Sequence, residues 1–194
     1  MIFQISFSII EQLTKQYGID VWSRFLEILY APKTNTDMIW ILIPLILTIL
    51  LLEFYFGRYV EEELGWNTAF ANSLVLIFVS IDLARHLYYS NLLFTINTKL
   101  ILAFIILIEG LSLAFIDFFH VLPKRIAFKL SSTLPINFIA FCCIILVYTD
   151  INIDFITISA FLLFLFFLVV IIGFIHIIEP KVRTMFTPPM PPTL

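Results

Sequence analysis

The stretch from Phe155 to Ile178 reads FITISAFLLFLFFLVVIIGFIHII and contains no Asp, Glu, Lys or Arg. An α-helix rises 1.5 Å per residue, so about 20 apolar residues cross the roughly 30 Å hydrocarbon core of a bilayer. This stretch is long enough and apolar enough to do so. It therefore predicts a transmembrane helix that faces lipid over much of its surface.

Four further apolar stretches of similar length precede this one along the chain. Hydrophobic residues make up 61% of the 194 residues, which is more than a water-soluble core requires. We therefore expect an all-α fold, a polytopic membrane helical bundle of about five transmembrane helices. The expected spans lie within residues 37–179, at about 38–56, 68–88, 100–119, 134–149 and 155–178.

The two ends of the chain differ from the spans in composition. In residues 1–36, apolar residues such as Ile10, Tyr17 and Phe25 recur at helical spacing between charged ones, which predicts an amphipathic helix. Such a helix lies in the membrane interface or docks on the bundle, and the pattern does not choose between the two. Residues 180–194 are rich in proline, which predicts an extended polar tail.

The distribution of positive charge predicts the orientation in the membrane. Lys124 and Arg125 fall in the expected loop between the third and fourth spans, whereas the next loop carries Asp150 and Asp154 and no Lys or Arg. Positively charged loops are retained on the cytoplasmic side, so the first loop is expected inside and the second outside. The chain is then a multi-pass protein of the cell membrane, with its N-terminus outside and its C-terminus in the cytoplasm.

Ionisable residues within the spans are the best functional candidates, because a charge at mid-membrane costs about 2.5 to 3.5 kcal/mol on insertion scales. Asp82 precedes Arg85 by three residues and His86 by four, so these side chains share one helix surface. Glu109 lies near the middle of the next span, and we expect it to form a buried cluster with Asp82 and Arg85. The full predicted polar cluster comprises Asn72, Asp82, Arg85, His86, Glu109 and Asp117.

A second set of polar residues is expected near the inner face of the membrane: His120, Lys124, Arg125, His176 and Glu179. A lipid-headgroup-modifying enzyme could use Asp117, His120 and Lys124 there. However, the chain has no nucleophile elbow and no phosphate-binding loop, and its segments outside the membrane are too short for a catalytic domain. We therefore expect no enzyme and no cofactor. The histidines fall at different depths without zinc-binding spacing, so no metal site is expected.

Two kinds of function fit these observations. The first is a scaffold or accessory subunit of a larger membrane assembly. The alternative is an oligomeric ion or proton channel or transporter that uses the polar cluster as its pathway. The expected partners are the lipid bilayer and either other membrane subunits or further copies of the chain. Nucleic acid is not expected, because 11 Lys and Arg against 14 Asp and Glu leave no basic surface.

Overall fold

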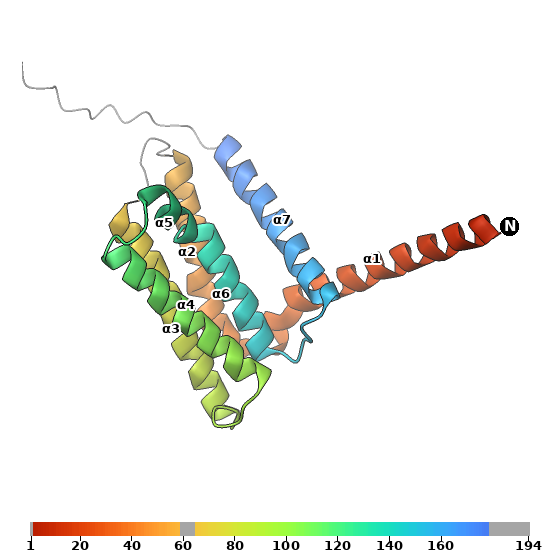
Figure 1. The fold of residues 1–194 in the computed structure, drawn as a ribbon, viewed down its shortest axis with the longest axis horizontal. Helices are drawn as coiled ribbons and strands as arrows, with labels where there is room; N and C mark the ends of the chain where they lie inside the picture. Colours follow the sequence, from red (N-terminus) through yellow and green to blue (C-terminus); the bar gives the residue numbers. More distant parts are fainter. Residues whose placement is uncertain (1, 59–64, 179–194) are drawn as a thin grey trace, which may run out of the picture.

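The computed structural model describes residues 2–58 and 65–178, which are almost entirely helical (Figure 1). No strand occurs among them, so the predicted all-α fold is confirmed. The expected tail, residues 180–194, lies outside the described residues. In chain order the helices are α1 (Ile2–Thr34), the short 3-10 helix η1 (Thr36–Met38), α2 (Ile39–Arg58), α3 (Trp66–Tyr89), α4 (Thr98–Phe118), α5 (Lys124–Leu130), α6 (Thr133–Tyr148) and α7 (Phe155–Ile178).

In the described ranges, five helical segments are long and apolar enough to cross a membrane. They are Thr36–Tyr55, Trp66–Tyr89, Thr98–Phe118, Lys124–Tyr148 and Phe155–Ile178. Each overlaps one of the predicted spans, and the last has the same bounds as the predicted fifth span. The protein is therefore a polytopic membrane protein with five candidate spans.

The expected loop with Lys124 and Arg125 is instead helix α5, which is a correction to the sequence analysis. Pro123 stands at its start, where the missing N–H of proline costs no helical hydrogen bond. The carbonyl oxygen of Pro123 accepts hydrogen bonds from the backbone N–H groups of Ile126 and Ala127. Both basic side chains are exposed on this helix. Which face of the membrane they occupy stays a prediction.

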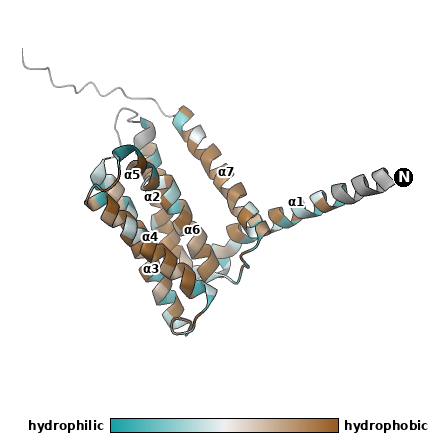
Figure 2. Cartoon of the chain, viewed as in Figure 1, coloured by the Kyte–Doolittle hydropathy of each residue, from teal (hydrophilic) through white to brown (hydrophobic). Residues whose placement is uncertain are grey.

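Helix α6 forms the centre of the bundle and packs against α2, α3 and α4 (Figure 1). Half of the α5–α6 span (50%) is buried, against only 11% of the α7 span. The core consists of fully buried apolar side chains, among them Leu76, Leu83, Ile106 and Ile144. The ribbon of α7 is almost wholly hydrophobic (Figure 2). Because so little of α7 is covered by protein, most of its surface is left to face lipid.

Helices α3 and α4 approach each other closely at Gly110. A Cβ atom built on Gly110 would lie 2.9 Å from Cβ of Leu76 and 3.1 Å from the backbone nitrogen of Ile77. Small residues at such contacts allow membrane helices to pack with their backbones near each other. This contact also fixes the depth of the preceding residue, Glu109, at the level of Ile77 on α3.

The turn between α3 and α4 uses an asparagine at each end. Asn91 has a left-handed φ of 57°, and the backbone N–H of Leu92 donates back to a carbonyl of α3 at 2.8 Å. Asn97 precedes α4, where its side chain accepts from the backbone N–H of Leu100 at 2.8 Å. Asparagine tolerates the first conformation and favours the second position. The turn makes α3 and α4 antiparallel and places Lys99 beside the α6–α7 connection.

Helix α1 is one continuous helix that leaves the bundle toward its N-terminal end (Figure 1). Its residues 11–19 are exposed, whereas Phe25, Ile28 and Ala31 are buried against the bundle. Tyr17 bonds through its hydroxyl to Oγ of Ser159 on α7 at 2.6 Å. The C-terminal half of α1 is thus docked on the bundle. An interfacial position for the exposed half stays a prediction.

Candidate functional site

Asp82 on α3 is held by two partners near one end of the bundle, which we call the Asp150 end. This end comprises the α1–α2 junction, the α3–α4 turn and the α6–α7 connection. Arg85 donates to Oδ1 of Asp82 from Nε at 3.0 Å and from Nη2 at 2.6 Å. Tyr148 on α6 donates its hydroxyl to Oδ2 at 2.7 Å. Both carboxylate oxygens of Asp82 are therefore satisfied within the chain, and α3 is tied to α6.

His86 lies beside this group without joining its hydrogen bonds. Its ring stacks on the ring of Tyr148, with the two centroids 3.9 Å apart. The stacked ring covers one face of the tyrosine that contacts Asp82. His86 therefore supports the position of Tyr148 through packing.

Glu109 lies apart from Asp82 and Arg85, which corrects the expected three-residue cluster. In the described part of the chain, the Glu109 carboxylate has no hydrogen bond or ion pair, and its side chain is half-buried. The physical reason is helix register. Glu109 is level with Ile77, five residues or about 8 Å along α3 from Asp82. Arg85 pairs with the carboxylate of Asp82, which lies one turn away on the same helix.

A second polar cluster is fully buried at the opposite end of the bundle, which we call the α5 end. Ser131 donates its hydroxyl to Oδ2 of Asp117 at 2.6 Å. Asn72 donates from Nδ2 to the carbonyl of Ser131 at 2.8 Å, and Asn137 donates to the carbonyl of Thr133 at 2.7 Å. The five side chains are between 0% and 4% exposed. This network joins α3, α4 and the α5–α6 junction.

Two acceptors of this network lack a donor among the described residues, namely Oδ1 of Asp117 and Oδ1 of Asn137. Asn72 and Asp117 thus belong to the α5 end, which corrects the expectation that they share a cluster with Asp82. Ten residues separate Asn72 from Asp82, or about 15 Å along α3. The predicted polar cluster therefore divides into two groups at different depths, with Glu109 between them.

His120 and the cations that follow it also lie at the α5 end. His120 has a left-handed φ of 52°, and its ring packs against that of Trp66 at a tilt of 32°, with centroids 4.1 Å apart. Lys124 and Arg125 are exposed on α5. Among the described residues, none of these three side chains forms a hydrogen bond or an ion pair with Asp117, whose hydrogen-bond partner is Ser131, so the structure does not join them into one reacting group.

His176 connects α7 to α2. Its Nε2 lies 3.0 Å from the carbonyl oxygen of Glu53 and 3.7 Å from Oε2 of the same residue. Glu179, the last of the predicted inner residues, lies outside the described residues. Among the residues that the structure does describe, no group of three or more His, Cys, Asp or Glu side chains could hold a metal ion.

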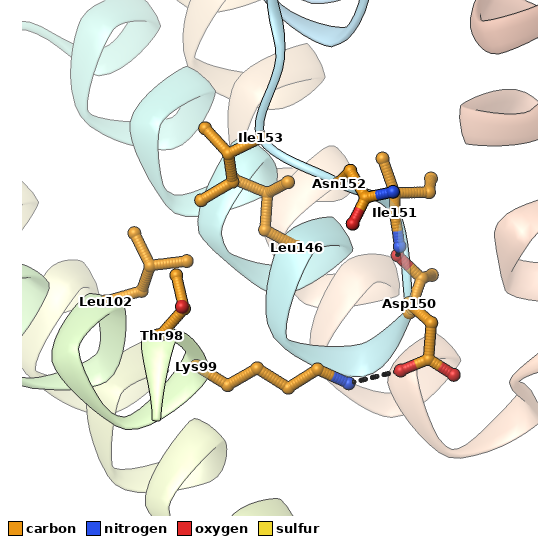
Figure 3. Close-up of a pocket in the computed structure, with 9 residues that line it drawn as sticks. Thr98, Lys99, Leu102, Leu146, Asp150, Ile151, Asn152 and Ile153 are labelled. Atoms are coloured by element: carbon orange, nitrogen blue, oxygen red, sulfur yellow. Dashed lines mark hydrogen bonds and ion pairs between the residues drawn. The ribbon is translucent and has the colours of Figure 1, made fainter. Parts of the chain in front are cut away.

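Two cavities open at the Asp150 end, on either side of the α6–α7 connection. The larger has a volume of about 560 Å³ and lies between Lys99 and Leu102 on α4 and the segment from Leu146 to Ile153 (Figure 3). Nζ of Lys99 donates to Oδ1 of Asp150 at 2.9 Å. This bond from the ammonium group holds the pKa of Asp150 below its usual range. The smaller cavity, about 200 Å³, reaches Glu27 on α1.

Asp154 shapes the same end by starting α7. Its Oδ1 accepts the backbone N–H of Thr157 at 2.7 Å, which lowers the pKa of Asp154. Arg24 of α1 approaches the other carboxylate oxygen at 4.0 Å. Asp154 therefore caps the start of α7 and also contacts α1.

Sequence reasoning missed Tyr148, Ser131 and Glu53 as partners of the predicted polar residues. Each stands at the edge of an apolar stretch, where Tyr148 resembles an interfacial aromatic residue and Ser131 a helix cap. The available signal was that a buried Asp or Asn needs a donor or acceptor from another helix. The sequence contains several candidate partners and does not show which one faces inward.

Comparisons with models of protein families, with curated proteins and with solved structures found no match to this chain.

Proposed function

We propose that the protein is an accessory or scaffold subunit of a membrane assembly and that a partner transmembrane helix binds α4 at Glu109. The observation that carries the proposal is this carboxylate itself. It is half-buried, near the middle of a candidate span, and without a hydrogen-bond or ion-pair partner in the residues described.

The depth of Glu109 makes an unsatisfied position costly. It is the twelfth residue of a 21-residue helix, about 16 Å from the helix start. Exposed apolar side chains surround it on α4, including Ile105 at 53% and Ile108 at 61%. An acid on such a surface needs a donor, and lipid tails provide none. A Lys, Arg, His or hydroxyl group on a neighbouring helix would supply it.

Two other intramembrane acids, Asp82 and Asp117, support the same proposal by contrast. Asp82 is satisfied by Arg85 and Tyr148, and Asp117 accepts from Ser131, so both act within the bundle. Glu109 alone of these three acids has no such bond among the described residues. A polar group left at the lipid-facing surface is typical of an interface between membrane helices, where polar side chains join neighbouring helices.

Site-specific crosslinking from native membranes tests the proposal. A photo-crosslinking residue at Ile108, next to Glu109, should capture a discrete membrane protein, whereas the same residue at Phe166, exposed at 60% on α7, should not. Glu109→Gln should reduce capture at least several-fold. Glu27→Gln, an acid on α1 that is 56% exposed, serves as the matched control and should leave capture unchanged.

Two outcomes would overturn the proposal. One is equal capture by the wild-type protein and Glu109→Gln. The other is a proton or ion flux in proteoliposomes of the purified chain that disappears on Glu109→Gln, because it would assign Glu109 to a pathway. A crosslink to a second copy of the chain would identify the partner helix as its own.

A further inference from the structure

The larger cavity at the Asp150 end lies at the level where lipid headgroups meet the bundle. It opens beside the start of the α4 span at Thr98, the end of the α5–α6 span at Tyr148 and the α6–α7 connection. Span ends fall at the boundary between hydrocarbon and water. A cavity of about 560 Å³ at this level is open to both the aqueous phase and the headgroups.

The charges of this cavity are one cation and one anion, Lys99 and Asp150, from opposite walls (Figure 3). Their ion pair is exposed to water, since the Asp150 side chain is 100% exposed and that of Lys99 is 26% exposed. Exposed ion pairs contribute little to stability, so a ligand that offers charges of both signs can replace the pair without leaving a charge unmatched.

The remaining lining gives the cavity an apolar side. Leu102 of α4 and Leu146 of α6 lie on the membrane side of Lys99, and Ile151 and Ile153 continue from the α6–α7 connection (Figure 3). The two leucines lie on helices that pack against each other, within two of the candidate membrane spans. Leucine and isoleucine walls suit the glycerol and acyl portions of a lipid, whereas a purely polar solute would leave them unfilled.

The wall formed by α4 also carries donors for an anion. Thr98 has an exposed hydroxyl in the first turn of α4, next to Lys99. The backbone N–H groups of Thr98 and Lys99 have no carbonyl partner inside the helix, whereas that of Leu100 is already bonded to the Asn97 side chain. Together with the Lys99 ammonium, the N–H groups of Thr98 and Lys99 can donate to the oxygens of a phosphate group.

We propose that this cavity binds a zwitterionic phospholipid whose headgroup ends in a primary ammonium group. The phosphate lies against Lys99 and Thr98, and the ammonium group donates to the Asp150 carboxylate. The part of the acyl chains next to the glycerol lies on Leu102 and Leu146. A primary ammonium has three N–H donors, whereas a trimethylammonium headgroup has none to offer the carboxylate. The site therefore favours phosphatidylethanolamine over phosphatidylcholine.

Native mass spectrometry of the detergent-purified full chain tests this preference. Dioleoylphosphatidylethanolamine should bind about tenfold more tightly than dioleoylphosphatidylcholine, the difference that a charge-assisted hydrogen bond typically makes. The soluble headgroup glycerophosphoethanolamine should bind at least tenfold more weakly than the lipid, since it lacks the acyl chains. Equal binding of the two lipids, or equal binding of the lipid and the soluble headgroup, would overturn the proposal.

Two single substitutions and two matched controls assign the effect to the cavity. Asp150→Asn should bring the binding ratio of the two lipids to about one. Lys99→Gln should weaken the binding of both lipids several-fold and keep the preference, because both lipids carry the phosphate that Lys99 contacts. Lys33→Gln and Asp37→Asn change exposed charges at the same end, outside the cavity, and should leave both affinities and their ratio unchanged. Far-UV circular dichroism checks that all four variants keep the helical content of the wild type. A folded Asp150→Asn variant with the full preference would refute the role of this carboxylate.

Discussion

Replacing Gly110 with alanine should weaken the packing of α3 against α4. The added Cβ would lie 2.9 Å from Cβ of Leu76, 3.0 Å from Cγ1 of Ile77 and 3.1 Å from the backbone nitrogen of Ile77. Carbon atoms in good contact are about 3.5 to 4.0 Å apart. The two helices must therefore separate by roughly 0.4 to 0.6 Å, because neither the backbone nitrogen of Ile77 nor the Cβ atom of Leu76 can rotate out of the way.

The expected loss follows from two opposing contributions. Overpacking a tight contact typically costs about 1 to 3 kcal/mol. Alanine recovers up to about 1 kcal/mol through its higher helix propensity, and less where the helix persists in the unfolded state. The net prediction is a destabilisation of about 1 to 2 kcal/mol. Separation of the helices also moves Glu109, so the variant should lose crosslinking at Ile108.

Unfolding by sodium dodecyl sulfate in mixed micelles, followed by circular dichroism, measures this free energy. Gly173→Ala is the matched control, because a Cβ atom built on Gly173 has no neighbour within 4 Å. That variant should equal the wild type or gain stability, by at most about 1 kcal/mol. If Gly110→Ala proved as stable as Gly173→Ala, the close approach of α3 and α4 would be disproved.

Three further predictions concern the polar groups. Tyr148→Phe leaves one oxygen of Asp82 without its α6 donor and should lower the free energy of unfolding by about 1.5 to 3 kcal/mol, measured in the same micelles. Asn72→Ala leaves the buried carbonyl of Ser131 without that donor and should cost about 1 to 3 kcal/mol, whereas an unchanged unfolding curve would exclude a buried network. The third is a pH dependence. The folded-state pKa of Asp150 is depressed by its lysine partner, so the pair stabilises the fold above the ordinary pKa of about 4 and is lost as pH falls through the lower folded-state value. Because the pair is exposed, the difference in melting temperature between wild type and Asp150→Asn should be small at pH 6 and should shrink toward zero as the pH falls to 3, and a constant difference would contradict the assignment.

The predicted spans agree with the structure because each rests on its own composition. The run from Phe155 to Ile178 is apolar enough to enter a bilayer whatever its neighbours are. The local sequence predicts secondary structure less reliably at the ends of the spans. The segment after Pro123 contains three cations and looks like a loop, yet it forms a short helix because proline is well suited to a helix start.

The sequence predicts which polar residues lie within the spans, but only partly which residues they bond to. The spacing of Asp82 and Arg85 brings them together on one helix, so their pairing needs no tertiary information. Tyr148 joins them from a position 66 residues away, and nothing in its own neighbourhood indicates that contact. Asn72 similarly bonds to the carbonyl of Ser131. The sequence did not predict this contact, because helical spacing puts Asn72 and Asp82 on the same side of α3.

By itself, the sequence determined the number of candidate spans, their approximate ends and the identity of the intramembrane polar residues. These properties follow from the free energy of transferring one segment into hydrocarbon, which depends on that segment alone. The tertiary structure decided which polar groups meet. Their depth and direction depend on how helices pack, and the contact of Gly110 with Ile77 separates Glu109 from Asp82. A shift of one helix along another by a single turn would have paired different residues, because side chains one turn apart differ in depth by about 5.4 Å.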